Sequence, residues 1–78
     1  LVGVSVRPNP AQSALFLDGL ADAAVQVELT DALGRTVLRT VLPAGSNRLD
    51  VGHLAPGSYY LRAVQNGRAA ATQVVLQR

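Results

Sequence analysis

The chain has 78 residues, of which 49% are hydrophobic and 15% are charged, and its formal net charge is +2 at pH 7. This length fits one small domain with a core built mainly from Val, Leu and Ala. There is no cysteine, which excludes a disulfide framework and a thiolate metal site, and no apolar run approaches the ~20 residues of a membrane span.

The positive charge is carried entirely by arginine, and lysine is absent. A sequence pI of about 9.9 weakly favours an anionic partner. A solvated surface is the simpler interpretation, because the arginines are spread along the chain and do not cluster. They are Arg7, Arg35, Arg39, Arg48, Arg62, Arg68 and Arg78.

The first expected element is a short strand that a proline-rich corner ends. Residues 4–7 (VSVR) alternate apolar and polar side chains, which predicts a strand with one buried face. Pro8, Asn9 and Pro10 follow, and two prolines in three residues cannot continue a strand interior. Each proline also keeps its predecessor extended. We therefore expect a stiff, non-helical corner directly after this strand.

Three further strands are expected before residue 43, each indicated by alternating apolar side chains. They cover residues 13–18 (SALFLD), 25–30 (VQVELT) and 35–42 (RTVLRTVL). The third loses its alternation partway, which favours a bulge or a two-sided strand. The residues expected to point inward from the first two are Leu15, Leu17, Val25, Val27 and Leu29.

Three short strands are expected in the second half of the chain, at residues 48–51 (RLDV), 59–64 (YYLRAV) and 71–77 (ATQVVLQ). Hairpin turns are indicated by the DALG segment that begins at Asp31 and by the Asn66-Gly67 dipeptide, which favours a type I′ turn. Apolar patches between strands are too short for stable helices. The expected inward residues are Leu49, Val51, Thr72, Val74 and Leu76. Residues 59–64 are expected to place Tyr59, Leu61 and Ala63 on one face and Tyr60, Arg62 and Val64 on the other.

About seven short strands, with turn signals roughly every 8–12 residues, predict an all-β fold. No segment is long enough for a helical crossover, so the strands should pair antiparallel. The predicted class is an immunoglobulin-like antiparallel β-sandwich of about seven strands in a single domain, 1–78. Tyr59, just after a Pro-Gly turn, is typical of a tyrosine corner, whose hydroxyl bonds to nearby backbone. This predicts a structural role for that phenol.

The residue types that carry catalysis or bind cofactors are sparse in this sequence. No acidic pair has a spacing typical of a glycosidase, and one histidine, His53, is too few for a zinc site. Asp18 and Asp22 flank a loop with too few oxygen ligands for calcium, so turn formation is the simpler interpretation. Tyr60 beside Arg62 is the one candidate for a nucleic-acid surface. We expect no catalytic residue, cofactor, metal, nucleic-acid binding or membrane insertion.

Three motifs, taken in their order and spacing, resemble one family over essentially the whole chain. They are PNP after the first strand, an acidic residue followed by GRTV, and LAPGSY followed by an NG hairpin and a closing apolar strand. Together they are similar to the C-terminal sorting domain of the type IX secretion system of Gram-negative bacteria, type A. The residues that carry the resemblance are Pro8, Asn9, Pro10, Gly34, Arg35, Leu54, Gly57, Tyr59 and Gly67.

The resemblance implies a secretion signal domain without enzymatic activity. Such domains follow an N-terminal cargo, and the outer-membrane translocon recognises them once the cargo has reached the periplasm. A sortase-like peptidase usually removes the domain, and the cargo is joined to a surface lipopolysaccharide or released, so the implied location is the periplasm in transit and then the cell surface or medium. Because the last strand carries much of the family's signal, recognition is expected at Val74, Val75, Leu76, Gln77 and Arg78.

A mechanism follows if the final strand lies at a sheet edge, because its backbone groups can then pair with a strand of another chain. Two alternatives stay open: a generic immunoglobulin-like spacer or adhesion module, and an accessory carbohydrate-binding module. A spacer would be followed by more chain, and a carbohydrate-binding module would present a row of aromatic residues, of which the chain has one Phe and two Tyr. Because the chain opens within an apolar run without Met, we expect a domain excised from a longer exported protein.

Overall fold

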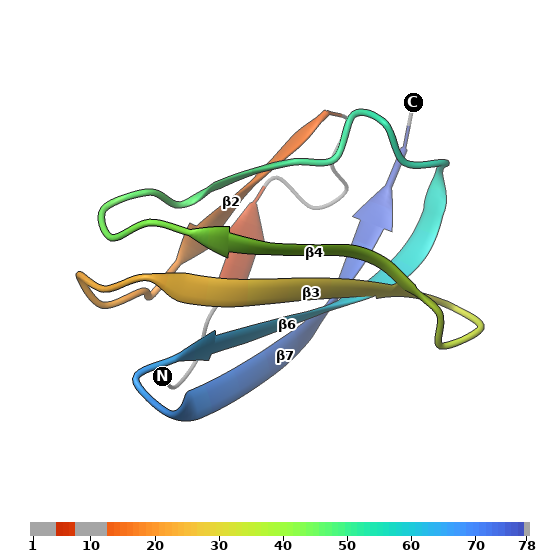
Figure 1. Cartoon of the computed structure of the whole chain (residues 1–78). Coiled ribbons are helices and arrows are strands. Elements are labelled where there is room, and N and C mark those ends of the chain that lie inside the picture. Colours follow the sequence, from red (N-terminus) through yellow and green to blue (C-terminus); the bar gives the residue numbers. More distant parts are fainter. Residues whose placement is uncertain (1–4, 8–12, 78) are drawn as a thin grey trace.

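The computed structural model describes residues 5–7 and 13–77, whose regular elements are all β-strands (Figure 1). The predicted corner at Pro8, Asn9 and Pro10 and the terminal Arg78 lie outside the described residues. The strands are β1 (Ser5–Arg7), β2 (Ala14–Asp18), β3 (Val25–Asp31), β4 (Thr36–Leu42), β5 (Arg48–Asp50), β6 (Gly57–Gln65) and β7 (Arg68–Leu76).

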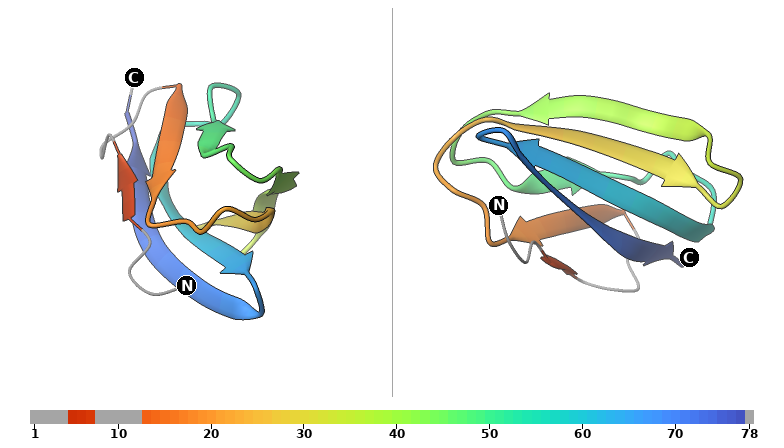
Figure 2. Two further views of the ribbon diagram at one scale, coloured as in Figure 1. Left: turned by 90° about the vertical axis from the view of Figure 1, so that its left-hand side faces the viewer. Right: turned by 90° about the horizontal axis from the view of Figure 1, so that it is seen from below.

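The strands form two antiparallel sheets, a three-stranded sheet in the order β1-β2-β5 and a four-stranded sheet in the order β4-β3-β6-β7. The sheets face each other as two layers (Figure 2). The all-β, seven-stranded sandwich predicted from the sequence is therefore confirmed. One difference from the constant-type immunoglobulin arrangement is that β4 pairs with β3, whereas there the fourth strand belongs to the opposite sheet.

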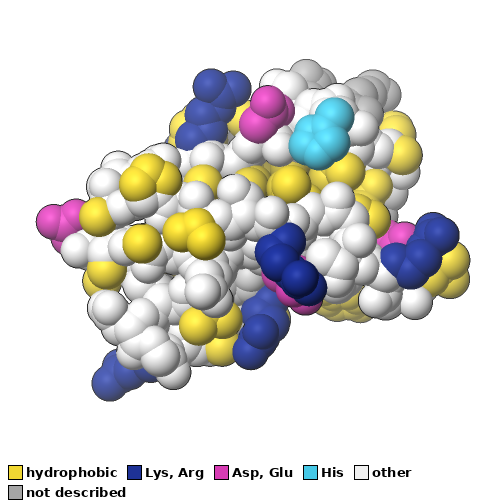
Figure 3. Space-filling model, viewed as in Figure 1, with side chains coloured by type: hydrophobic (Ala, Val, Ile, Leu, Met, Phe, Trp, Pro, Cys, Tyr) yellow, Lys and Arg dark blue, Asp and Glu magenta, His cyan; other side chains and the backbone are white. Residues whose placement is uncertain are grey.

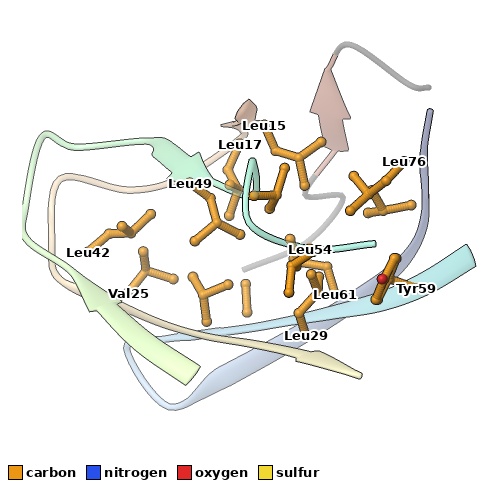
Figure 4. Close-up of a cluster of buried hydrophobic side chains, with 14 residues drawn as sticks. Leu15, Leu17, Val25, Leu29, Leu42, Leu49, Leu54, Tyr59, Leu61 and Leu76 are labelled. Atoms are coloured by element: carbon orange, nitrogen blue, oxygen red, sulfur yellow. The ribbon is translucent and has the colours of Figure 1, made fainter. Parts of the chain in front are cut away.

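Side-chain alternation places the core between the two sheets (Figure 4). All the predicted inward residues are buried except Thr72, which is half-buried in the middle of β7. On β6 the face that carries Tyr59, Leu61 and Ala63 is the buried one. Leu42 and Leu54 complete the core. The core therefore contains Leu, Val, one Ala and one Tyr, as the composition required. Burying one of the Leu or Val side chains contributes about 1.5–3 kcal/mol to the stability of the folded state.

The irregular alternation of β4 has a single cause, a bulge opposite the end of β3. Leu38 pairs with Leu29 and Thr36 pairs with Thr30, so Val37 is the extra residue. An inserted residue shifts the side-chain parity of a strand, and Val41 beyond it faces outward with 57% of its surface exposed. The expectation of a bulge is confirmed.

Both predicted hairpin turns are present. Gly34 has a φ of 83° and its N–H donates to the Asp31 carbonyl at 3.0 Å, which closes the β3–β4 turn. Asn66 and Gly67 have φ values of 53° and 74°, the type I′ conformation that glycine and asparagine tolerate best. Pairing resumes at once after that turn, so β7 begins at Arg68, three residues earlier than predicted.

Candidate functional site

The predicted recognition segment belongs to β7, which is the terminal strand of the four-stranded sheet. β7 pairs with β6 along its whole length, from Arg68 opposite Gln65 to Leu76 opposite Gly57. Within the part of the chain that the structure describes, β6 is its only sheet neighbour, and β1 of the other sheet contacts it. β7 is therefore an edge strand in the described sheet.

The five predicted recognition residues divide into two kinds. Val74 and Leu76 point inward and are 0% and 1% exposed, so their side chains hold the core. Val75 is half-buried on the other face, and Gln77 is exposed beyond the strand. Arg78 lies outside the described residues. Among the predicted recognition residues that the structure describes, Gln77 is thus the one with an exposed side chain that a partner can contact without unfolding the domain.

The backbone of the first half of β7 has groups directed away from β6. Gln65 and Arg68 flank the two-residue turn, and such residues form a hydrogen-bonded pair. Along an antiparallel ladder, hydrogen-bonded and non-hydrogen-bonded pairs alternate. Ala69, Ala71 and Gln73 therefore direct their N–H and C=O groups to the edge of the sheet, where a further strand can pair.

The motif LAPGSY leads into β6 and lies beside the end of β7. The Tyr59 hydroxyl donates to the Ala55 carbonyl at 2.5 Å, which confirms the predicted tyrosine corner. Tyr59 lies opposite Val74 in the ladder and Gly57 lies opposite Leu76. Leu54 is buried on the same side of the core as Tyr59 and Leu76 (Figure 4). This motif fixes the loop that leads into β6, and β6 is the strand with which β7 pairs.

The second motif builds a rigid hairpin around one carboxylate. Asp31 Oδ1 accepts from the N–H groups of Leu33 and Arg35 at 2.9 and 3.0 Å, and its Oδ2 accepts from Arg35 Nε at 2.9 Å. The bond from the Arg35 backbone N–H contributes most. Together with the other bonds and the charge of Arg35, it outweighs the opposing effect of burial and holds the pKa of the Asp31 carboxyl below its ordinary value. The side chains of Leu33 and Arg35 themselves are exposed.

The sheet register brings these features together. Asp31 lies opposite Tyr59 and Tyr59 lies opposite Val74, so the second and third motifs and the end of β7 share one end of the sandwich. Gly67 lies at the opposite end, in the β6–β7 hairpin. The motif residues in the described ranges thus shape turns and strand ends, and they do not converge on one pocket.

Sequence reasoning missed Gln65, a buried polar residue at the end of β6 that is 2% exposed. Its Oε1 accepts from Ala21 N–H at 2.8 Å, and its Nε2 donates to the carbonyls of Ala21 and Ala23 at 2.9 and 2.8 Å. These bonds fasten the loop that crosses from β2 to β3. The signal was available, because Gln65 continues the inward series of Tyr59, Leu61 and Ala63, and an inward polar side chain needs buried partners.

Reactive side chains in the described ranges do not form a chemical site. No group of three His, Asp or Glu residues there is placed to hold a metal ion, and Asp18 accepts from Arg7 Nε at 2.9 Å. His53 is exposed in the β5–β6 loop, and Tyr60 is 52% exposed on β6. No helix in the described residues is long and apolar enough to cross a membrane.

Fold and site together define a small antiparallel β-sandwich with an edge strand in the described sheet and glycine-containing hairpin turns. The sequence matches the family model of the secretion system C-terminal sorting domain over residues 5–77, and the chain belongs to this family of type IX secretion signals. A comparison with curated proteins gave no match. The family is one of secretion signals and not a catalytic one, and membership implies an N-terminal cargo exported toward the cell surface or the medium.

Proposed function

We propose that the outer-membrane translocon of the type IX system recognises this domain through β7 after the cargo has reached the periplasm. A sortase-like peptidase then removes the domain, and the cargo is joined to a surface lipopolysaccharide or released. The observation that carries this proposal is the edge position of β7 in the described sheet. A strand of the translocon pairs with that edge and extends the four-stranded sheet.

Strand addition suits a signal that many different cargos carry. Backbone hydrogen bonds supply affinity whatever the side chains are, and alternate side chains supply specificity. The backbone groups of Ala69, Ala71 and Gln73 in β7 supply the first. The exposed side chain of Gln77, just after the strand, supplies the second, with Arg78 following in sequence. The inward residues of β7 contribute by keeping the strand straight and in register.

The arrangement of the strand ends supports separate recognition and removal. The chain leads into β1 at Ser5, which lies opposite Asp18 at the end of β2. The loop after Asp18 is held by Gln65, beside the β6–β7 hairpin. Leu76 ends β7 at the opposite end of the sandwich, beside Gly57. A translocon holding the C-terminal end therefore leaves the cargo junction accessible to a peptidase.

An export assay with edge variants tests the proposal. The domain is fused behind a periplasmic signal peptide and a fluorescent protein, and it is expressed in a host with a working type IX system. Ala71→Pro removes an edge N–H that β6 does not use, and proline is tolerated at such positions. Ala71→Ser is the matched control, since it keeps the N–H. Thermal unfolding of each purified domain verifies that it is folded.

We expect the parent fusion and Ala71→Ser to reach the surface or medium, and Ala71→Pro to stay in the periplasm although folded. Export of Ala71→Pro at the parent rate would refute strand addition at this edge. Retention of the folded parent would refute the secretion function and favour the spacer or adhesion module. Deletion of residues 74–78 is a poor substitute, because losing Val74 and Leu76 costs about 3–6 kcal/mol of a total near 4–12 kcal/mol.

A further inference from the structure

The outer face of the four-stranded sheet presents two adjoining rows of side chains that the register aligns across β4, β3 and β6. One row is mostly apolar and the other is charged. The apolar row contains Val41, Gln26 and Val64, and the charged row contains Arg39, Glu28 and Arg62. Neither row contributes to the core, so the fold leaves these side chains available to a partner.

The two rows line a hollow of about 310 Å³ on this face. In the space-filling view, the side of the molecule that presents β3 and β4 shows arginine and acidic surface next to hydrophobic surface (Figure 3). Val41 is 57% exposed at one margin, and Tyr60, on the same outward face of β6, is 52% exposed. Two of the three large hydrophobic residues that are strongly exposed in the described ranges thus lie on one face.

The charged row has one more positive than negative group. Nε and Nη2 of Arg39 both lie 3.0 Å from Oε2 of Glu28. Arg62 lies opposite Glu28 on its other side, and among the described residues it forms no ion pair. One carboxylate therefore stands between two guanidinium groups, and the Arg62 group can receive a carboxylate from another molecule in the fork geometry that arginine favours.

We infer that this face docks a protein partner that places an apolar side chain in the hollow and a carboxylate against Arg62. Arginine and tyrosine around an apolar centre are the residue types that carry binding energy at protein interfaces. A polyanion such as an acidic polysaccharide fits poorly, because Glu28 opposes it at the centre of the row and the hollow is also lined by Val27, Val41 and Val64. The partner is a protein surface in which Asp or Glu flanks an apolar residue.

This inference rests on the proposed function in one respect: the partner is sought among the proteins of the type IX machinery. It needs the sheet face, whereas strand addition needs the edge of β7. The test places a photo-reactive phenylalanine analogue at Val41, with the same analogue at Phe16 on the other sheet as the positional control. The label is introduced in the exported fusion, and adducts are recovered from the cell envelope and identified by mass spectrometry.

A matched pair of double variants tests the charge requirement. Arg39→Gln with Arg62→Gln removes both positive charges from the row and leaves the carboxylate of Glu28. Arg48→Gln with Arg68→Gln removes two positive charges elsewhere, so both pairs lower the net charge of +2 by the same amount. Glutamine avoids placing a new carboxylate beside Glu28. We expect adducts at Val41 with an acidic segment of the machinery, reduced about tenfold by the first pair and unchanged by the second.

The inference is overturned if Val41 gives no protein adduct, if the adduct joins two copies of this chain, or if both charge pairs reduce it equally. Reduced export by the first pair without a protein adduct would point instead to an anionic polysaccharide and would also overturn it. Crosslinking is scored in the envelope whether or not the cargo leaves the cell. A fusion that is retained but crosslinked therefore refutes the secretion function and leaves the docking face standing.

Discussion

Replacing Gln65 should destabilise the domain more than any other single polar substitution among the described residues. Gln65→Met keeps the length of the side chain but removes three hydrogen bonds to the β2–β3 loop. Each such bond contributes about 0.5–1.5 kcal/mol net, so the expected loss is about 2–4 kcal/mol. For a domain of this size, 1 kcal/mol lowers Tm by about 4–8 °C, so the loss predicts a fall of about 8–32 °C.

The measurement is thermal and urea unfolding followed by circular dichroism. Gln73→Met is the matched control, because Gln73 is exposed on β7 and surface substitutions usually change stability by about 0.5 kcal/mol or less. A Gln65→Met domain that melts within ~2 °C of the Gln73→Met domain would refute the reasoning. It would show that the loop contacts contribute nothing beyond what water supplies after the change.

A second variant separates the hydrogen-bond argument from simple packing. Gln65→Glu is isosteric but turns a donor toward the Ala21 and Ala23 carbonyls into an acceptor. Repulsion from those carbonyls and burial should raise the pKa of the new carboxyl above its unfolded value of about 4.3. The variant should therefore be least impaired below pH 4 and lose stability as pH rises toward 7. A pH-independent loss would show that packing alone matters.

Three other predictions concern the turns. Tyr59→Phe removes the bond to the Ala55 carbonyl and should cost about 0.5–1.5 kcal/mol in urea unfolding; an unchanged midpoint would show that the tyrosine corner adds no stability. Gly67→Ala places a β-carbon at a φ of 74° and should cost about 1–2 kcal/mol, whereas a stabilised variant would contradict the type I′ geometry. The Asp31 carboxyl has a lowered pKa, so its stabilising effect is complete above the unfolded pKa and disappears as pH falls through the folded pKa. Asp31→Asn should therefore flatten the fall of unfolding free energy with decreasing pH. An unaltered pH dependence would assign that fall to other carboxylates.

The positions of the strands and the direction of their side chains were predictable from the sequence, because apolar and polar residues alternate along a half-buried strand. The series Val25, Val27, Leu29 can bury itself in only one way, and the structure buries it so. The two hairpins were predictable for a different reason, since DALG and Asn66-Gly67 encode specific backbone conformations. Local chemistry was sufficient wherever a single strand or turn determined the outcome.

Sheet order was beyond such reasoning, because alternation is the same whichever neighbour a strand takes. Nothing within β7 indicates that it lies at the edge of the sheet or that β4 joins β3's sheet. The row of Arg39, Glu28 and Arg62 was hidden for the same reason, since these residues lie on three strands and meet only through the register. The burial of Gln65, by contrast, was predictable, because Gln65 continues the alternate positions of Tyr59, Leu61 and Ala63. The predicted strand ended one residue before it.

The two faces of β7 give different meanings to mutations in the same short segment. Inward positions such as Val74 and Leu76 are coupled to the whole core, so a change there alters export by altering the folded population. Exposed positions such as Ala71 and Gln73 lie outside that core, so under the proposed recognition a change there acts through the partner. A loss of export therefore identifies a recognition residue only when the variant unfolds at the parent temperature, and alternate residues of one strand should divide cleanly by that criterion. If the proposed recognition holds, one strand contributes to the stability of the core through its inward side chains and to recognition through its edge.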